Sequence, residues 1–573
     1  MDKRTVVAIV LIMLILIIAP WYMRLISGPP QEPPEQEEVV SEPRVEQEEE
    51  KIPLPKDQRA VLLTDLTDLE QKSLAVKSEF FRGTIDTKGA VLTKWEIKPR
   101  LSNLEQQDWV ELLPTMMEKG ALSVSFPVNG GEVSTADLIF ECEDDSLVLN
   151  AANPEGHVSL MAETVEGVRV VKEFHFHHHR HSIGMRVRIE GAEKLQQGHQ
   201  YTLWWKPGLS ATEHEKRKDD LRSFAAHAML GDVKEKTQFK GNAIKDSIFT
   251  GDTKWLAIQT KYFLMAMIPP KDVDGLGVKI RGWYQQEDKE KDLPEQRIIG
   301  GGINMPLQSG MCDHSWEIYL GPMDYFVLKD YDLGLEKMVN LGFKYIRWIG
   351  LIILQFFVKV HQIIPNYGVV IIIFSIIIKV LFYPLTRKSF ESMEKMRDIQ
   401  PKINELREKY KKDPAKLNRA TMELYKKYKI NPVSGCFPML LQMPVFFALF
   451  RVFTNTVELR GENFLWIKDL SAPDTLIHLP WDVPLYGDAF NLLPIVMAVT
   501  MFIQQKISMK DPKQAAMVYL MPIFLFFLFN KFSSGLVLYW TMFNVLTILQ
   551  EQLRHRRKMA LEEKESEVSS KKS

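Results

Sequence analysis

The stretch VVIIIFSIIIKVLFYPLT, residues 369–386, is an apolar run that carries one cation, Lys379. A helix of about 20 apolar residues spans the hydrocarbon core of a bilayer. A lysine at the centre of such a helix costs roughly 2.5 to 3.5 kcal/mol, so these residues usually face a protein interior or a water-filled cavity. The run therefore predicts a membrane helix, within a span bounded at 365–386, whose charge needs either a function or a route to water.

Residues 1–28 contain a second long apolar segment, TVVAIVLIMLILIIAPWYM, which follows the basic residues Lys3 and Arg4. The segment is longer than the apolar core of a cleavable signal and offers no small-residue cleavage site. We expect an uncleaved membrane anchor whose N-terminus is cytoplasmic. Residues 29–58 are rich in Pro, Glu and Gln, which predicts a disordered acidic tether.

Residues 59–342 show short alternating runs separated by Gly, Asn and Pro, which predict a large antiparallel sandwich. The segment FHFHHHRH, residues 174–181, is interpreted as a hairpin, with one strand ending at Phe176 and the next beginning at Ser182. No carboxylate or cysteine pattern completes a metal site there. A disulfide between Cys142 and Cys312 stays open, and Cys436 falls in a membrane segment.

Residues 343–364 are long enough to cross a bilayer, but their pattern is amphipathic. An apolar stripe follows helical spacing, while charged and amide residues gather on another side. This pattern predicts a helix that lies in the membrane interface. The stripe consists of Ile349, Ile352, Ile353, Phe356, Val360, Ile363 and Ile364.

The remaining segments predict the topology of the chain. Residues 387–430 hold 14 Lys and Arg against 7 Asp and Glu, which indicates a cytoplasmic loop, and four further spans fall within 431–552. The basic tail, residues 553–573, is then also cytoplasmic. The expected fold is a polytopic α-helical membrane protein with six spans, five of them forming a core, and a large extracytoplasmic all-β sandwich domain.

Catalytic signatures for nucleotide or peptide hydrolysis are not found in the sequence. A catalytic dyad with Ser375 as nucleophile and Lys379 as base is disfavoured. In such a dyad the base is aimed at a nucleophile held by a separate part of the protein, whereas these two residues lie on adjacent turns of one helix. Two interpretations of Lys379 stay open, namely a hydrated groove and snorkelling toward Arg387. Polar or aromatic residues of other spans that could line such a groove are Gln442, Tyr539, Trp540, Asn544 and Gln550, and interhelical hydrogen bonding is the alternative for Asn544 and Gln550.

The cytoplasmic loop is predicted to be a basic helical hairpin. Its first helix, residues 389–410, presents an apolar stripe that includes Met393 and Met396, and Asp413-Pro414 marks the start of the second helix. Methionine-bearing surfaces suit contact with varied apolar partners, whereas packing of the two helices against each other is the structural alternative. The residues expected to recruit partners are Met393, Met396, Arg397, Lys402 and Arg407.

Four segments resemble the YidC/Oxa/Alb family of membrane protein insertases, of the Gram-negative type with a large exported domain. They are LFYPLTRKSFESMEKMRDIQPKI (381–403), NPVSGCFPMLLQMPVFFALF (431–450), VELRGENFLWIKDLSAPD (457–474) and SSGLVLYWTMFNVLTILQ (533–550). TIDTKGA (84–90) and WLAIQTKYFLMAMIPP (255–270) are similar to the periplasmic β-supersandwich of that family.

The resemblance implies where a substrate groove lies. The groove charge of the family, usually Arg, falls on Lys379, its polar neighbour on Ser375, and its aromatic contacts on Tyr539 and Trp540. A lysine keeps the charge but loses the planar fork of arginine, so attraction is expected and forked recognition is not. Ser534 is a further departure, because many relatives have Pro before the SGL stretch.

The expected function is that of an insertase and chaperone of the bacterial inner membrane, with no enzyme activity, cofactor or metal. The resemblance implies that the substrates are nascent or small membrane proteins, which enter alone or beside the Sec translocon. It also implies the ribosome and the targeting machinery as partners of the hairpin and the tail. Specific nucleic-acid sequences are not expected partners. The alternatives are a small-anion transporter or channel, and a membrane-tethered scaffold whose periplasmic domain binds a ligand.

Overall fold

The structure, a computed structural model, divides into two compact units, which are described separately. One unit contains the β domain and ends at Val339, and the other contains the helices from Asn340 onward. The predicted anchor (1–28), the tether (29–58) and Cys436 lie outside the described residues. These are residues 70–99, 108–114, 121–128, 131–165, 167–194, 199–213, 217–239, 245–285, 296–308, 310–430, 437–483, 486–508 and 515–570.

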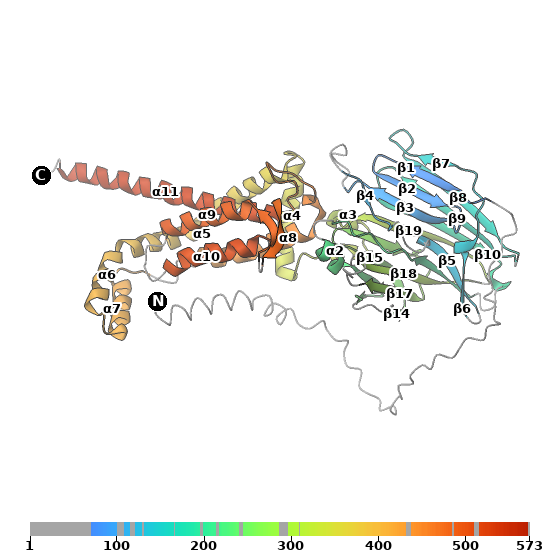
Figure 1. Cartoon of the computed structure of the whole chain (residues 1–573), viewed down its shortest axis with the longest axis horizontal. Coiled ribbons are helices and arrows are strands. Elements are labelled where there is room, and N and C mark those ends of the chain that lie inside the picture. The colour runs from blue at the N-terminus through green and yellow to red at the C-terminus, as the bar shows by residue number, and fades with distance from the viewer. Residues whose placement is uncertain are drawn as a thin grey trace, which may run out of the picture. The chain divides into compact units, whose positions relative to one another are not determined.

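The β domain is built from two large sheets (Figure 1). The first has eleven strands in the order β14-β17-β18-β11-β5-β3-β2-β1-β7, with β4 on β3 and β6 on β5. Its strands are β1 Ser73–Lys77, β2 Phe81–Asp86, β3 Val91–Ile97, β4 Val110–Glu111, β5 Ala121–Val128, β6 Gly131–Ser134, β7 Ser146–Val148, β11 Gln200–Trp205, β14 Lys245–Thr250, β17 Gly277–Gln285 and β18 Gln296–Pro306.

The second sheet has eight strands in the order β13-β12-β15-β16-β19-β10-β9-β8. The strand pairs of both sheets are antiparallel except for β1 with β7. The strands of the second sheet are β8 Glu155–Glu163, β9 Arg169–His177, β10 Ser182–Glu190, β12 Ala225–Leu230, β13 Val233–Thr237, β15 Thr253–Gln259, β16 Phe263–Ile268 and β19 Cys312–Pro322. Short helices of the unit are η2 Thr135–Asp137, η3 Ala192–Lys194, α2 Arg217–Ser223, α3 Tyr325–Asp330 and η4 Leu335–Met338.

The predicted hairpin at FHFHHHRH is confirmed. β9 and β10 pair antiparallel, with Ile183 opposite Phe176 and Glu190 opposite Arg169. The first strand runs one residue further than predicted, to His177. Cys142 and Cys312, by contrast, are both free thiols, so the disulfide left open by the sequence is not formed.

The core of the β domain lies between apolar rows of the two sheets. Trp95 of β3 stacks on Phe81 with ring centroids 4.8 Å apart and on Phe176 of β9 at 6.2 Å. The inward row of β9 consists of Val170, Lys172, Phe174 and Phe176, all buried. One cation therefore stands in an otherwise apolar row, in keeping with the two-residue period of a strand.

Lys172 is held by backbone carbonyls of the opposite sheet. Its Nζ donates to the carbonyl oxygens of Gly89 at 2.7 Å, Ala90 at 3.2 Å and Leu122 at 2.9 Å. Ala90 and Leu122 have φ angles of 47° and 68°, in the left-handed region that non-glycine residues rarely occupy. The ammonium thus ties β9 to two strained segments of the first sheet, and the sequence analysis did not single it out.

The second unit is helical apart from one hairpin. Its helices are α4 Lys344–His361, α5 Tyr367–Asp398, α6 Gln400–Lys409, α7 Pro414–Lys427, α8 Phe437–Asn455, η6 Val457–Leu459, α9 Leu493–Ser508, α10 Ala515–Phe529 and α11 Ser534–Ser570. The hairpin consists of β20 Thr475–Val483 and β21 Gly487–Asn491. In the described part of the chain, one helix, α5, is long and apolar enough to cross a membrane, and 440–455, 493–507 and 518–529 are shorter apolar helices.

Helix α4 covers most of the predicted interfacial segment, but it buries a different face from the predicted stripe. Of the predicted stripe, Ile353 is buried against protein, whereas Ile352 and Ile363 are exposed. Phe357, which was outside the stripe, stacks on Phe453 of α8 with ring centroids 5.6 Å apart. The buried face is made by Ile346, Gly350, Ile353, Leu354 and Phe357, while Tyr345, Trp348 and Ile352 form a second, exposed apolar face.

Two helices are longer than the sequence boundaries suggest. α5 continues without a break from the apolar run through Arg387 to Asp398, and α11 continues through the segment interpreted as a tail (Figure 1). The first predicted hairpin helix, 389–410, is divided at Ile399, because Pro401 stands in the first turn of α6. Proline lacks the amide needed for an interior helical hydrogen bond but is tolerated in a first turn.

Candidate functional site

Lys379 of α5 donates a hydrogen bond to α11, and its ammonium also lies near Phe390, three residues beyond Arg387 on its own helix. Its Nζ donates to Oγ1 of Thr547 at 2.7 Å. The same ammonium lies 4.4 Å from the ring centroid of Phe543 and 5.7 Å from that of Phe390. A cation on aromatic faces gains roughly 0.5 to 2 kcal/mol, depending on its exposure. The side chain is thus anchored to the last helix, through Thr547 and Phe543, which are not among the residues of that helix that the sequence singled out.

Thr547 can accept this hydrogen bond because its own proton is already committed. Its Oγ1 donates to the carbonyl oxygen of Phe543 at 2.7 Å, one turn earlier in α11. A hydroxyl has one proton and two acceptor lone pairs, so a lone pair is left for the ammonium. Tyr539, Phe543 and Thr547 follow at intervals of four, which places them on one helix face. That spacing, counted from Tyr539, is the sequence signal that could have identified Thr547, which the sequence analysis did not name.

Ser375 is buried one turn before Lys379, and its Oγ donates to the carbonyl oxygen of Ile371 at 2.7 Å. A hydroxyl that bonds back to its own helix satisfies itself locally. The expectation that adjacent turns make a poor Ser–Lys dyad agrees with this geometry. Ser375 therefore lies near Lys379 along the helix without bonding to it.

Gln442 and Tyr539 form a second polar pair within the bundle. Nε2 of Gln442, on α8, donates to the hydroxyl of Tyr539 on α11. Tyr539 also packs against Phe374, with ring centroids 6.0 Å apart, and against Phe543 at 6.5 Å. The ammonium of Lys379 lies over the ring of Phe543, so Phe543 contacts both Lys379 and Tyr539. The structure thus brings Gln442, Tyr539 and Lys379 into the same region.

Trp540 and Asn544 face other partners. Trp540 lies against Phe446 and Phe529, with ring centroids 5.1 Å and 5.5 Å apart, in an aromatic cluster of α8 and α10. The amide nitrogen of Asn544 lies 3.5 Å from the carbonyl oxygen of Met497 and 3.4 Å from Oγ1 of Thr500, both on α9. These contacts match the structural alternative for Asn544, which was interhelical hydrogen bonding. Neither side chain contacts Lys379.

Several buried polar atoms near this region have no hydrogen-bond partner among the described residues. They include both amide atoms of Gln550, three residues after Thr547, as well as Oε1 of Gln442 and Nε1 of Trp540. Polar groups withdrawn from water without a partner cost free energy, and most buried ones are paired. The amide atoms of Gln550 on α11 and Oε1 of Gln442 on α8 are therefore buried polar groups whose hydrogen-bonding capacity is not used by the described residues.

The two hairpin helices pack together around Ile399, Ile403 and Ile430, and Met396 packs against this cluster. Lys402 donates a hydrogen bond to the hydroxyl of Tyr428 on the facing segment. Arg407 reaches Oδ1 of Asn404 at 3.3 Å. Part of the predicted recruitment surface is therefore used within the hairpin itself. The side chains of Met393 and Arg397 lie outside the described set.

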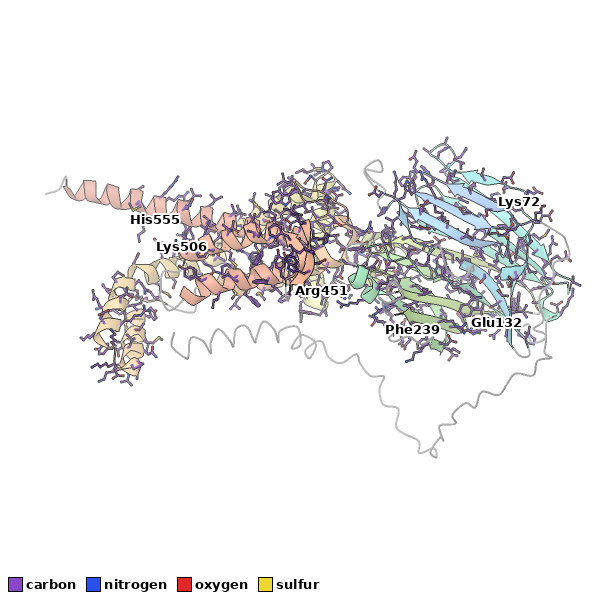
Figure 2. All side chains as sticks on the ribbon, in the orientation of Figure 1. Lys72, Glu132, Phe239, Arg451, Lys506 and His555 are labelled. Atoms are coloured by element: carbon purple, nitrogen blue, oxygen red, sulfur yellow. The ribbon has the colours of Figure 1, made fainter. Side chains whose placement is uncertain are left out.

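The C-terminal part of α5, after Arg387, is joined to the C-terminal part of α11 by ion pairs. Nζ of Lys558 lies 3.0 Å from Oδ2 of Asp398 and 3.3 Å from Oε1 of Glu394. The guanidinium of Arg554 lies 5.4 Å from the ring centroid of Phe390. Figure 2 marks His555 on this part of α11 and Lys506 near the end of α9. The segment interpreted as a tail is thus a helix that contacts the base of the hairpin.

Comparisons with known proteins relate both units to one family. A family model described as "YidC periplasmic domain" matches residues 73–355, and one described as "60Kd inner membrane protein" matches residues 359–562. A protein of Chlorobium phaeovibrioides named "Membrane protein insertase YidC" is 34% identical over 488 residues, which cover 84% of this chain and 82% of that protein.

A protein of the same name from Prosthecochloris aestuarii is 32% identical over 567 residues, covering 96% of this chain and 94% of that protein. A solved structure described as "Active YidC insertase crystal structure with the first transmembrane domain resolved" has a TM-score of 0.37 and 17% identity, and covers 85% of this chain and 94% of that one. The sequence relationships extend over nearly the whole chain and include both units. The chain therefore belongs to the YidC family of membrane protein insertases.

Proposed function

We propose that this protein inserts other proteins into the bacterial inner membrane and that Lys379 is the charge that attracts their polar segments. The observation that carries the proposal is the position of Lys379, whose ammonium has one hydrogen-bond acceptor among the described residues, Thr547. The family relationship supports insertion over the two alternatives, a small-anion transporter and a tethered ligand-binding scaffold.

An ammonium with donors to spare can bind a second acceptor. Lysine carries three N–H donors, and Thr547 occupies one of them. A carboxylate at about 4 Å gains about 1 kcal/mol in water and about 4 kcal/mol at the effective dielectric of a protein surface. Acidic or polar segments of a substrate would therefore be drawn to Lys379, and their cost of leaving water would fall.

Polar atoms beside the lysine would help to hydrate such a segment. Gln550 and Gln442 offer amide atoms that have no protein partner among the described residues. Water-filled cavities are where ionisable residues within membranes are usually found. We infer a hydrated groove at Lys379, because its ammonium keeps N–H donors that no acceptor of the described residues takes up.

Helix lengths support a locally thin bilayer beside the groove. The described part of α9, up to Ser508, has 16 residues, and that of α10, from Ala515, has 15. At 1.5 Å per residue they are about 24 and 23 Å long, against about 30 Å for the hydrocarbon core. Short hydrophobic helices are accommodated by thinning of the bilayer. A thinner membrane shortens the distance over which a polar segment must travel.

The apolar part of a substrate needs a different surface. On α5, exposed apolar side chains flank Lys379 on both sides in the sequence, namely Ile376, Ile377, Val380 and Leu381. A substrate helix could slide along this surface into lipid, driven by burial of about 25 cal/mol per Å² of apolar area. No external energy source is required for this step.

The wider arrangement is part of the same proposal. Six spans with both termini in the cytoplasm, and the β domain in the periplasm, follow from the distribution of basic residues. The hairpin of α6 and α7 then lies on the cytoplasmic side, where its lysines and arginines would meet ribosomes or targeting factors. The Sec translocon is proposed as a partner for larger substrates.

Reconstitution tests the proposal directly. The purified chain is placed in liposomes, and a small membrane protein with an acidic exported segment is added. We expect insertion well above empty liposomes and a loss of about tenfold in rate for Lys379→Ala. Lys506→Ala, an exposed lysine at the end of α9, is the matched control and should leave the rate unchanged. Insertion equal to that of empty liposomes would refute the proposal.

A further inference from the structure

The hairpin of β20 and β21 stands at the ends of three helices, and its base is fixed to all of them. Oδ2 of Asp474 accepts a hydrogen bond from the backbone amide of Leu493, at the start of α9, at 2.6 Å. Nδ2 of Asn491 donates to the carbonyl oxygen of Asn530, just after α10, at 2.6 Å. The hydroxyl of Ser534, at the start of α11, donates to the carbonyl oxygen of Asp469 at 2.9 Å.

These anchoring groups are buried, so the base is a rigid element. Asp474, Asn491 and Asn530 are each no more than about 5% exposed, and Nδ2 of Asn530 also donates to the carbonyl oxygens of Tyr486 at 3.0 Å and Ala489 at 3.1 Å. Buried amide donors that are paired with backbone carbonyls in this way favour one arrangement of the segments they join. The hairpin is therefore held at the level where the apolar helices end.

The arms of the hairpin, in contrast, expose large apolar side chains. Leu476 is 48% exposed, Ile477 64% and Trp481 66%. The turn that precedes the hairpin adds Leu465 and Trp466, and Nε1 of Trp466 donates to Asp474 at 3.1 Å. A hairpin of two strands is marginally stable on its own in water. Exposed apolar patches of this kind mark an interaction surface.

We propose that this hairpin lies in the interfacial layer of the lipid bilayer and inserts Ile477 and Trp481 at the boundary of headgroups and acyl chains. The helices to which its base is tied are those of a membrane protein family, so the bilayer surface begins at the level of its anchors. Tryptophan is enriched at that depth. Residues 475–491 contain no Lys or Arg, so the contact that the hairpin itself makes is apolar. The inference goes beyond insertion, because it assigns a lipid contact to a segment away from Lys379.

A depth measurement tests this placement. Cys142, Cys312 and Cys436 are replaced by Ser, and one cysteine is introduced by Ile477→Cys or, in a second variant, Trp481→Cys. Each is labelled with an environment-sensitive fluorophore and reconstituted into phosphatidylcholine vesicles. We expect lipids with brominated chains to quench both labels about twofold, while iodide in the water quenches them weakly.

His478→Cys is the matched control, because His478 is the neighbouring residue and its Nδ1 lies 3.5 Å from Oδ2 of Asp488 on the facing strand. Its label should respond to iodide more than to brominated lipid. Strong iodide quenching at 477 and 481 would overturn the proposal, and so would protection from both quenchers, which indicates a protein neighbour. Insertion activity measured in the same vesicles confirms folding, and it separates a failure of this proposal from a failure of the proposed function.

Discussion

Lys172 and Lys379 are both withdrawn from water, but their surroundings differ. Lys172 is fully buried between the sheets of the β domain and donates to three backbone carbonyls. Lys379 is half-buried among helices and donates to one side-chain hydroxyl, with aromatic rings beside it. Three acceptors match the three donors of an ammonium, whereas one leaves donors for another molecule.

The difference separates a structural cation from a candidate binding cation. The acceptors of Lys172 are backbone atoms on strained left-handed residues, which the fold itself fixes in place. The acceptor of Lys379 is a threonine on another helix, and nearby amide atoms of Gln550 have no partner among the described residues. The number of protein acceptors, three for Lys172 and one for Lys379, therefore separates the two roles, together with the deeper burial of Lys172.

Removing the saturated lysine should have the largest effect. Lys172→Met leaves three buried carbonyl oxygens without their donor, and each unsatisfied group costs about 1 to 3 kcal/mol. We expect the β domain to lose on the order of 3 kcal/mol or more of unfolding free energy at pH 8. Denaturant unfolding, followed by hydrogen exchange in β9, measures it. Lys94→Met, at a half-exposed side chain, is the control, and equal losses in the two variants would contradict the role of the carbonyls.

The same lysine should make stability depend on pH. Burial lowers the pKa of the Lys172 ammonium to about 7, whereas an unfolded lysine has a pKa near 10.4. Between those values the unfolded chain binds more protons, so the unfolding free energy rises with pH by up to about 1.4 kcal/mol per unit. Subtracting the pH profile of Lys172→Met from that of the parent isolates this contribution. A flat difference between pH 7 and 10 would show that the three carbonyls outweigh burial.

Removing the hydrogen-bond acceptor of Lys379 should have a smaller effect than removing Lys172. The effect should appear in the rate of insertion rather than in stability. Thr547→Val removes the acceptor of Lys379 but keeps the shape of the side chain. One hydrogen bond to a charged group is worth about 1.5 kcal/mol, so we expect insertion of an acidic substrate to slow about three- to tenfold. Thr541→Val is the control, because its hydroxyl bonds to the carbonyl oxygen of Val537 on its own helix. If both variants insert at equal rates, Thr547 does not position the lysine.

An exposed lysine completes the series with the smallest effect. Lys558 bridges Asp398 and Glu394 at 3.0 and 3.3 Å, on surfaces that remain partly open to water. Surface ion pairs contribute about 0 to 1 kcal/mol. Lys558→Met should therefore lower the thermal unfolding temperature of the helical unit by no more than a few degrees. If Lys558→Met lowered the unfolding temperature as much as Lys172→Met does, the contributions of Lys172, Lys379 and Lys558 to stability would not follow their exposure to water.

Much of the fold could be predicted from periodicity and charge. Alternation at FHFHHHRH predicted the β9–β10 hairpin, and the amphipathic pattern of 343–364 predicted a helix there. The buried face of α4 could not be predicted, because the helix has apolar residues on two sides and tertiary packing against α8 selects between them. Helix ends also escaped prediction, since basic residues mark a membrane boundary without ending a helix, as at Arg387.

The sequence was enough to predict which residue carries the charge of the site, but not which residues contact it. Lys379 is visible because one cation interrupts an apolar run. Gln442 is visible as a polar residue within a span, and the family resemblance pointed to Tyr539, to which Gln442 is bonded. Thr547 was missed because a threonine in an apolar helix is ordinary until the neighbouring helix is placed beside it. Trp540 and Asn544 share α11 with Thr547 but face other helices, which no count along one sequence reveals.

The most direct test of the central claim exchanges charges between the chain and its substrate. Lys379→Glu and Lys379→Arg are compared with the parent in liposomes, using two substrates that differ only in an acidic or a basic exported segment. If Lys379 attracts polar segments by its charge, Lys379→Arg inserts the acidic substrate at the parental rate. Lys379→Glu should lose that substrate by about tenfold or more and gain the basic one. Insertion rates that do not depend on the sign of either charge would contradict the claim.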